Sequence, residues 1–296
     1  MNSICILLTD HISLNEQILI KSLIKLKKNK LNKIYFVGDK TKYKKFYIKI
    51  QKVKKIKFIN ILIKKKNYFN YLKEILSIGI DLYRKKKIKF LINMPLDKKK
   101  FFNTKYPGFT EFFSYEFDKK NDQNMLMFSK KISVCPLTTH INLKKVDENI
   151  NKKILINCIN NIFFFFKKII KKKINIIVLG LNPHAGKDMT NANNKDKKII
   201  KPVIKYFKKK GLNIDGPLSA DTAFCNYKNK VYLGMYHDQV LTPFKIINNI
   251  NGINITIGKK LIRLTPGHGT GNSKKINSKL ISNNSFLECI KFCENY

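Results

Sequence analysis

The chain has 296 residues, of which 44% are apolar, so it can bury a sizeable core and is not disordered throughout. Its formal charge is +41, but the lysines are spread along the whole chain and form no single basic tail or stripe. We therefore interpret the charge as a compositional bias over solvated positions, and we expect no specific nucleic-acid partner.

No signal peptide opens the sequence, and no apolar run approaches the length of a membrane span. The six cysteines show neither a C-x-x-C pair nor zinc-finger spacing. Cys289 and Cys293 would share one face of a helix, where they are expected to pack as small apolar residues. We expect a cytoplasmic protein with no membrane contact.

Strand-like and helix-like segments alternate along the chain. The pattern predicts, in chain order, a strand over 3–9, a helix over 13–28 with Ser13 as its N-cap, strands over 33–39 and 56–63, a helix over 68–87, a strand over 88–96, a helix near 146–172, a strand over 174–181, a helix near 195–210 and strands over 231–236 and 260–264. Such alternation is typical of an α/β fold with a largely parallel or mixed sheet. In these folds, ligands bind at the carboxyl ends of the strands.

Histidine is scarce, and three of the five histidines follow predicted strands. His140 ends TTH, His184 lies in NPHAG and His237 lies in YHDQ. Three neutral imidazoles could hold a divalent metal with one position left open for substrate, although each histidine alone could equally be structural or solvated. They are too far apart for a local metal motif, so only the fold could bring them together. His11 has no such context and is interpreted as structural or surface.

Arginine is even scarcer, since Arg84 and Arg263 are the only two. Arg84 heads a lysine run and is expected at the surface, whereas Arg263 lies in an apolar stretch and is a candidate for a bidentate ligand contact. Together with Lys245 and Asn254 it could bind a phosphorylated or carboxylated substrate, although Lys245 alone would be read as a surface lysine. The glycine-rich GHGTG (267–271) could cradle phosphate, but it is not a G-x-G-x-x-G fingerprint.

Several longer strings occur in a specific order. They are LINMPLDK (91–98), YPGFTEFF (106–113), LTTHINL (137–143), LGLNPHAGK (179–187), GPLSADTAF (216–224), MYHDQVLTPFK (235–245), NITIG (254–258) and IRLTPGHGT (262–270). In wording, order and spacing they resemble the 4-hydroxythreonine-4-phosphate dehydrogenase family. The resemblance covers roughly residues 90–270 and is faint over the first 85 residues.

The resemblance implies an α/β fold of two domains with a cleft, similar to isocitrate and isopropylmalate dehydrogenases. It suggests a first domain of residues 1–103 with 253–296 on the cofactor side, and a second of residues 104–252 on the metal and dimer side. It also implies a homodimer whose active site lies at the interface, with ligands from both subunits.

The family's reaction is the oxidation of 4-phosphohydroxy-L-threonine by NAD or NADP, with decarboxylation to 3-amino-2-oxopropyl phosphate, on the way to pyridoxal phosphate. It depends on a divalent metal such as zinc, magnesium or cobalt. The resemblance assigns the metal to His140, His184 and His237, the substrate to Thr110, Lys245, Asn254 and Arg263, and the cofactor to Gly269 and Thr270. Asp221 and Asp238 are the candidates for proton transfer.

The chain also departs from the family pattern. Phe109 stands where the family has histidine before Thr110, and Gly267 stands where it has an acid. TDHISLNE (9–16) replaces a glycine- and proline-rich loop, and KDMTNANNKDKK (187–198) replaces an acidic, glycine-rich one. Two alternatives therefore stay open: a dehydrogenase for a related phosphorylated hydroxy acid, and a catalytically degraded dehydrogenase retained as a cationic binding protein.

Overall fold

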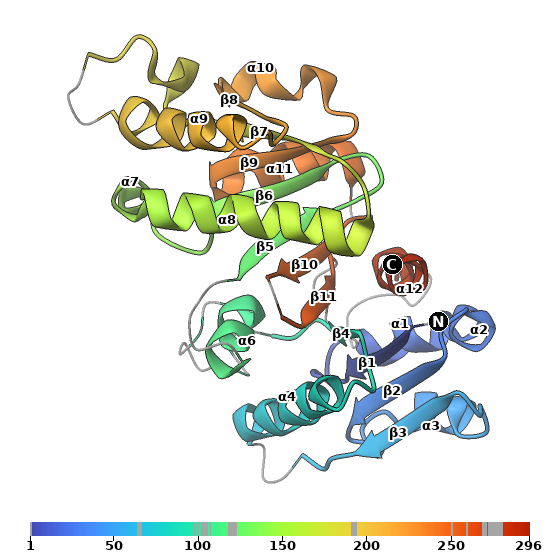
Figure 1. Cartoon of the computed structure of the whole chain (residues 1–296). Coiled ribbons are helices and arrows are strands. Elements are labelled where there is room, and N and C mark those ends of the chain that lie inside the picture. The colour runs from blue at the N-terminus through green and yellow to red at the C-terminus, as the bar shows by residue number, and fades with distance from the viewer. Residues whose placement is uncertain are drawn as a thin grey trace. The chain divides into compact units, whose positions relative to one another are not determined.

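The computed structural model describes residues 2–63, 67–97, 99, 101, 106, 108–117, 123–190, 194–249, 251–258, 260–267, 271 and 281–296. The chain forms two compact units (Figure 1). Unit 1 is Met1–Asn121 with Ile250–Asn254 and Lys260–Tyr296, and unit 2 is Asp122–Asn249 with Ile255–Lys259. The segment up to Asn121 thus groups with unit 1, whereas the sequence assigned residues from 104 onward to the second domain; the functional division into domains stays a prediction.

Unit 1 contains a parallel sheet. Its strands are β1 (Ser3–Leu7), β2 (Lys33–Gly38), β3 (Ile56–Asn60), β4 (Phe90–Asn93) and β11 (Ile262–Pro266), in the order β3-β2-β1-β4-β11. Most of β1, β2 and β4 is buried on both faces, which accounts for their nearly continuous apolar sequences. A further strand, β10 (Ile253–Ile257), begins in unit 1 and ends in unit 2.

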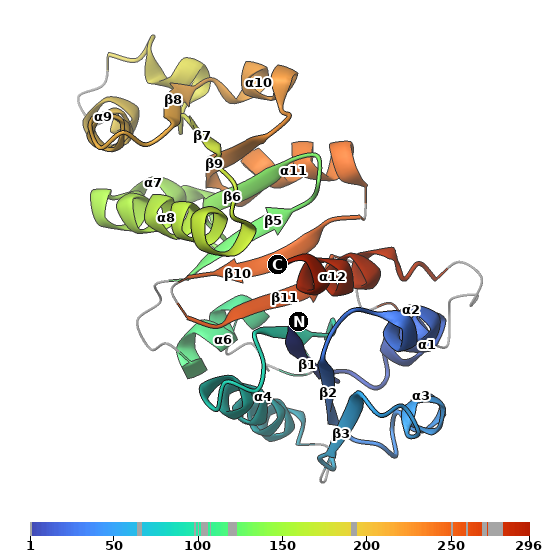
Figure 2. The same cartoon turned by 45° about the vertical axis from the view of Figure 1, so that its right-hand side comes forward.

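Helices cover both faces of this sheet. They are α1 (Asn15–Lys21), α2 (Leu23–Lys28), α3 (Lys44–Ile50), α4 (Tyr68–Arg84), α6 (Phe109–Phe117) and α12 (Asn284–Asn295). Helix α4 lies on one face, and α1 and α3 lie on the other (Figure 2). The prediction of one helix over 13–28 is wrong, because the helix is divided at Ser22, whose Oγ donates to the Ile18 carbonyl at 2.8 Å. Ser13 is also not the N-cap, a position that Leu14 takes.

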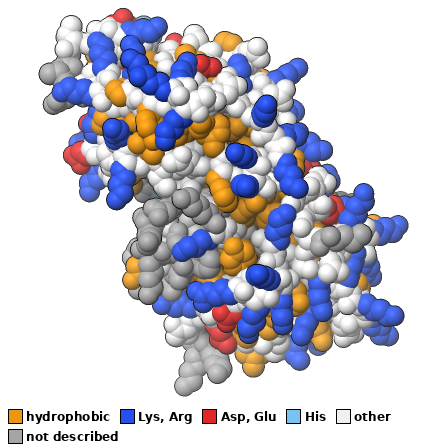
Figure 3. Space-filling view, in the orientation of Figure 1, with side chains coloured by type: hydrophobic (Ala, Val, Ile, Leu, Met, Phe, Trp, Pro, Cys, Tyr) orange, Lys and Arg blue, Asp and Glu red, His pale blue; other side chains and the backbone are white. Residues whose placement is uncertain are grey.

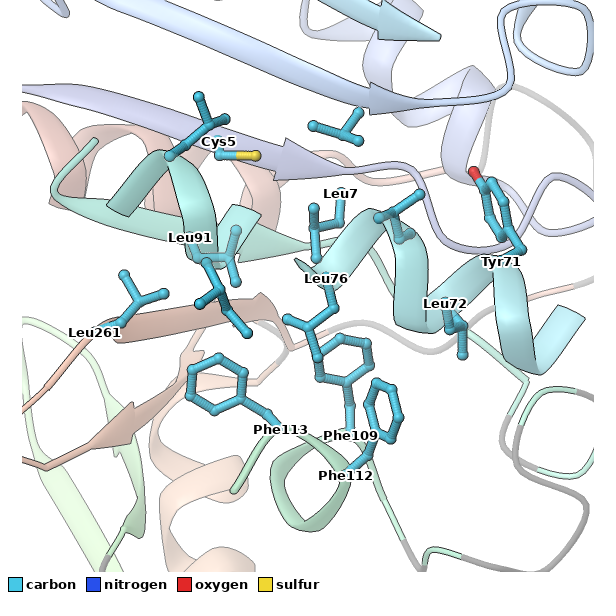
Figure 4. Close-up of a cluster of buried hydrophobic side chains, with 14 of the residues drawn as sticks. Cys5, Leu7, Tyr71, Leu72, Leu76, Leu91, Phe109, Phe112, Phe113 and Leu261 are labelled. Atoms are coloured by element: carbon cyan, nitrogen blue, oxygen red, sulfur yellow. The ribbon is translucent and has the colours of Figure 1, made fainter. Parts of the chain in front are cut away.

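An apolar cluster fixes α6 to unit 1. Leu7 of β1 and Leu91 of β4 meet Leu76 of α4 and the rings of Phe112 and Phe113 of α6 (Figure 4). Each of these side chains is almost fully buried, and such burial contributes about 1.5–3 kcal/mol per side chain. The cluster therefore sets the position of the first turn of α6, which carries Thr110.

Unit 2 contains a mixed sheet. Its strands are β5 (Asn124–Phe128), β6 (Ser133–Thr138), β7 (Asn175–Leu179), β8 (Ile214–Leu218) and β9 (Lys230–Tyr236), in the order β5-β6-β9-β7-β8. Only the β5–β6 pair among these described neighbours is antiparallel. Both units confirm the predicted α/β fold with parallel and mixed sheets.

In unit 2 the helix predicted near 146–172 is divided at Ile150 and Asn151, whereas the segment predicted near 195–210 is helical as expected. Unit 2 contains five α-helices among its described residues. They are α7 (Val146–Asn149), α8 (Lys152–Phe165), α9 (Lys201–Lys209), α10 (Ala220–Ala223) and α11 (His237–Asn248), with π-helical turns at Phe166–Ile170 and Asp196–Ile200 and 3₁₀ turns at Leu143–Lys145, Pro183–Gly186 and Phe224–Asn226. Helices α8 and α11 cover opposite faces of the sheet (Figure 2). Among the described helices of either unit, none combines the length and apolarity needed to cross a bilayer.

Candidate active site

The carboxyl ends of three neighbouring strands carry the histidines of unit 2. His140 follows β6, His184 follows β7, and His237 begins α11 directly after β9. Strands β6, β9 and β7 are adjacent and parallel, so these ends lie along one edge of the sheet.

Two side chains tie the three strand ends together. The Thr138 Oγ donates to the Met235 carbonyl at 2.7 Å. Gln239 accepts from the Met235 N–H at 2.7 Å and donates to the Gly180 carbonyl at 2.7 Å. The glutamine of the string GMYHDQ therefore cross-links the ends of β9 and β7, and it holds the segment that carries His237.

His140 and His237 lie next to each other. Their ring centroids are 5.6 Å apart, and the Nδ1 atom of His237 lies 2.7 Å from a carboxylate oxygen of Asp238. A carboxylate that holds one ring nitrogen fixes the orientation of the imidazole and leaves the other nitrogen as a metal ligand. The donor set of this pair therefore fits a divalent metal ion.

His184 lies in a loop with an unusual backbone. His184 has φ 51° and Ala185 has φ 54°, a left-handed conformation that is uncommon outside glycine and clusters at functional sites. Asp196 supports the loop by accepting the Leu181 N–H at 2.7 Å. A side chain at Gly180 would place its Cβ 2.5 Å from the Ala185 Cα, so only glycine fits at that position.

His184 does not join the other two histidines. Its Nδ1 lies 2.5 Å from a carboxylate oxygen of Asp188, and this hydrogen bond raises the pKa of His184 above its usual value. Within the described part of one chain, no group of three or more His, Cys, Asp or Glu side chains forms a metal cluster. The three-histidine metal set therefore stays a prediction.

The two candidate acids of unit 2 have different surroundings. Asp221 and His184 both line a cavity of about 690 Å³. A hydrogen bond from Ser219 is the main cause that lowers the pKa of Asp221, so this carboxylate is ionised at neutral pH. Asp238 is exposed and contacts His237, which is itself a candidate metal ligand.

Arg263 is the centre of a buried polar cluster in unit 1. Its side chain is 1% exposed, and its Nη1 donates to the Asn93 Oδ1 and the Thr265 Oγ1, each at 2.7 Å. Its Nη2 donates to the Thr110 Oγ1 at 2.9 Å. Burial lowers the pKa of Arg263 to about 9, a shift that Glu111 partly opposes, so the guanidinium is still a cation at neutral pH.

Aromatic rings pack against the same guanidinium. The Arg263 Cζ lies 5.3 Å from the ring centroid of Phe109 and 6.0 Å from that of Phe113. Phe109, which stands where the family has histidine, therefore offers the cation an apolar face and no hydrogen-bond donor. Together with the hydrogen bonds, the rings hold the guanidinium in one orientation.

The sequence did not single out Asn93 or Thr265. Asn93 ends β4 and Thr265 lies in the neighbouring parallel strand β11. The two side chains are also hydrogen-bonded to each other at 2.7 Å. Both belong to strings that carry the family resemblance, LINMPLDK and IRLTPGHGT, but the strings alone do not show which polar residue faces Arg263.

The remaining predicted substrate residues are less constrained. Lys245 is an exposed residue of α11. Asn254 lies in β10, and its Oδ1 is buried with no hydrogen-bond partner within the described part of the chain. A buried oxygen of this kind can be satisfied by a ligand that supplies a donor.

The predicted cofactor residues Gly269 and Thr270 lie outside the described residues. Gly267, just before them, is described. A Cβ at this position would lie 2.5 Å from the Gly252 carbonyl oxygen. The two backbones approach so closely here that a side chain at this position would require the backbone to shift.

A family model and curated relatives match this chain. The model of the pyridoxal phosphate biosynthetic protein PdxA matches residues 4–293. A 4-hydroxythreonine-4-phosphate dehydrogenase of Sulfurihydrogenibium sp. (strain YO3AOP1) is 34% identical over 295 residues, which cover 92% of this chain and 91% of the relative. A D-threonate 4-phosphate dehydrogenase of Pectobacterium atrosepticum is 32% identical over 168 residues, which cover 56% of this chain and 51% of the relative.

Solved structures share the fold. The crystal structure of a 4-hydroxythreonine-4-phosphate dehydrogenase from Klebsiella pneumoniae has a TM-score of 0.80 at 21% identity, and the match covers 99% of this chain and 100% of that one. An isocitrate dehydrogenase from Methylococcus capsulatus has a TM-score of 0.52 at 11% identity, with 98% and 84% covered. The predicted isocitrate dehydrogenase-like fold is therefore confirmed. From the sequence match over nearly its whole length, the chain belongs to the PdxA family of pyridoxal phosphate biosynthetic proteins.

Proposed function

We propose that the protein oxidises 4-phosphohydroxy-L-threonine with NAD or NADP and releases carbon dioxide to give 3-amino-2-oxopropyl phosphate. Family membership and the name of the relative from Sulfurihydrogenibium sp. support a dehydrogenase of this substrate. The observation that carries the proposal is the 2.9 Å hydrogen bond between Arg263 and Thr110, which are 153 positions apart in the chain. The resemblance of the sequence to the family implies a substrate role for both residues.

Arg263 and Thr110 are proposed to bind the anionic end of the substrate. A buried cation whose donors are fixed by Asn93 and Thr265 loses little side-chain freedom when a phosphate or carboxylate binds. Asn254 has a buried amide oxygen that a donor group of the substrate would satisfy. Lys245, an exposed residue, is proposed to add a second cation.

His140, His184 and His237 are proposed to hold a divalent metal ion such as zinc, magnesium or cobalt. When bound, such an ion polarises a substrate oxygen and stabilises negative charge that develops on it. Asp238 orients His237 for this role through their 2.7 Å contact.

Asp221 is proposed to accept a proton from the substrate, with Asp238 as the second candidate for proton transfer. The Asp221 carboxylate is ionised at neutral pH and so can accept a proton, while its lowered pKa makes it a weaker base than an ordinary aspartate. NAD or NADP would accept the hydride, and Gly269 and Thr270 are proposed to contact it.

We also propose a homodimer in which His184 of one copy joins His140 and His237 of the other. His184 has a side chain 65% exposed and makes no three-residue metal group with the other two among the described residues. Large apolar side chains near these histidines are exposed as well: Ile141, Leu143, Met189 and Leu218. Burial of such groups in a subunit interface is favourable. The six cysteines are free, which suits a reducing cytoplasm.

A related substrate is the second candidate, because one relative is a D-threonate 4-phosphate dehydrogenase. D-threonate has a hydroxyl group where threonine has an amino group, so the two substrates differ in one charge. The Phe109 ring lies 5.3 Å from the Arg263 Cζ, at the position where the family pattern has histidine, and this departure supports a second candidate substrate. Because of Phe109, both substrates should be tested.

Turnover decides the proposal. We expect metal-dependent formation of NADH or NADPH from 4-phosphohydroxy-L-threonine, measured at 340 nm with zinc, magnesium or cobalt, and a smaller kcat/KM for D-threonate 4-phosphate. The reverse preference would move the assignment to the second substrate. Folded protein that turns over neither substrate, with any metal or cofactor, would favour a degraded enzyme kept for binding. The basic side chains spread over the face in Figure 3 would then be the feature to test, through the salt dependence of nucleic-acid binding.

A further inference from the structure

A second cavity lies away from the candidate active site. It has a volume of about 560 Å³, and Ile174 and Asn213 in its wall directly precede β7 and β8. His184 and Asp221 follow the same two parallel strands at their other ends. Five residues of strand span about 16 Å. The cavity and the candidate active site therefore occupy opposite edges of the unit 2 sheet.

The wall of this cavity is apolar. Phe166 of the π-helical turn is 5% exposed, and Phe163, Ile174 and Leu212 are half-buried. Concave apolar surfaces of this size are typical of small-molecule sites. The cavity thus offers a place for the apolar body of a ligand.

Four lysines surround the apolar wall. Lys167, Lys171, Lys172 and Lys173 are all exposed and line the cavity. Lys171 has φ 56°, and the Lys172 N–H donates to the Phe166 carbonyl at 3.1 Å, so the helix ends there. Among the described residues that line the cavity, none is a carboxylate. Asp215, near the start of β8, is bound by Lys208 at 2.7 Å.

We propose that this cavity binds an amphipathic organic anion. The apolar body would lie against Phe163, Phe166 and Leu212, and the anionic head would lie among Lys171, Lys172 and Lys173. Ammonium groups act as point charges and lack the planar fork of arginine. The site therefore selects for negative charge next to an apolar body and does not distinguish a carboxylate from a sulfonate or phosphate. The proposal does not rest on the proposed catalytic function.

Lysines at the end of a helix also interact with the helix dipole, whatever they bind. The end of α4 provides a matched control for this effect. There Lys85, Lys86 and Lys87 are exposed, and Lys86 has φ 53°, so the run has the same charge and the same left-handed turn. None of the three lines the cavity.

The first experiment is a titration of the full chain with the fluorescent anion 8-anilinonaphthalene-1-sulfonate. Changing Lys171, Lys172 and Lys173 together to Gln should weaken binding by about tenfold, whereas the same change at Lys85, Lys86 and Lys87 should alter it by less than about twofold. Equal effects of the two triple variants would overturn the proposal. Asn213→Trp, which places a large ring at the exposed mouth, should weaken binding as well, and unchanged affinity would count against the cavity.

The second experiment separates the charge from the apolar body by competition against the bound probe. Dodecanoate should displace the probe, while 1-dodecanol and inorganic phosphate at the same concentration should not. Displacement by 1-dodecanol would reveal a purely apolar site, and displacement by phosphate would reveal a simple anion site. Either result would refute an amphiphile site.

Discussion

Two regions can be compared: the Arg263 cluster of unit 1 (Arg263 with Asn93, Thr110 and Thr265) and the histidine edge of unit 2 (His140, His184 and His237). They differ in how many of their proposed contacts a single chain already forms. Arg263 is buried, and its hydrogen bonds to Asn93, Thr265 and Thr110 are formed by folding alone. His184 and Asp238 are exposed, and the described histidines of one chain form no metal cluster. The first region is preorganised by its own chain, while the second is proposed to be completed by a metal ion and a second copy of the chain. Variants at the histidines should therefore lose turnover and keep their stability, whereas variants at Arg263 should lose both.

The largest effect is expected for His237→Ala. Loss of a metal ligand should reduce kcat/KM on the order of a thousandfold. The half-exposed imidazole is not part of a core, so the free energy of unfolding should change by less than about 0.5 kcal/mol. Turnover and urea unfolding measure the two quantities. His11→Ala is the control histidine, and turnover that survives His237→Ala would exclude His237 as a ligand.

Arg263→Lys should damage both activity and stability. The ammonium keeps the charge, but it cannot reach Asn93, Thr265 and Thr110 together while it packs on Phe109. We expect kcat/KM to fall about a hundredfold and the free energy of unfolding to fall by about 2 kcal/mol, because buried polar groups lose their partner. Arg84→Lys is the matched control, since Arg84 has a side chain that is 67% exposed. If both variants behave alike, the Arg263 cluster does not position the substrate.

Mixing two inactive variants tests whether two copies complete the histidine edge. In a dimer of His184→Ala with His237→Ala, one of the two shared sites keeps all three histidines. Random reassembly of equal amounts should restore roughly a quarter of wild-type turnover. A mixture that stays inactive, although dimers form and exchange, would show that the three ligands come from one chain.

Much of the fold follows from local sequence signals, but the candidate site follows only in part. The strands 33–39 and 231–236 were predicted within a residue or two, because they are buried apolar runs bounded by turn residues. The helix over 13–28 was not, because apolar periodicity continues across Ser22, where the structure divides the segment into α1 and α2.

The parts of the candidate site that the sequence did not predict depend on side-chain contacts that only the folded chain forms. Asn93 could not be matched to Arg263 from sequence, since their contact depends on β4 pairing with β11 across 170 positions. Asp188 and Asp196, which contact His184 and its loop, lie in a stretch that was read only as a departure from the family. Resemblance assigns residues at matching positions, whereas the partners of those residues depend on how this chain packs.

The smallest predicted effect is a shift in the pH dependence of kcat/KM. A variant in unit 2 should show this shift, and a variant in unit 1 should not. Ser219 donates to Asp221 and lowers its pKa, so Ser219→Ala should raise that pKa toward the usual value. A base with a raised pKa is protonated at higher pH, and the acid limb of kcat/KM should therefore move to higher pH. Thr265→Val removes a hydroxyl from the Arg263 cluster and should lower kcat/KM without moving this limb. Profiles from about pH 2.5 to pH 7 include the range in which this carboxyl group titrates and would show the difference, and an unmoved limb in Ser219→Ala would remove Asp221 from the role of base.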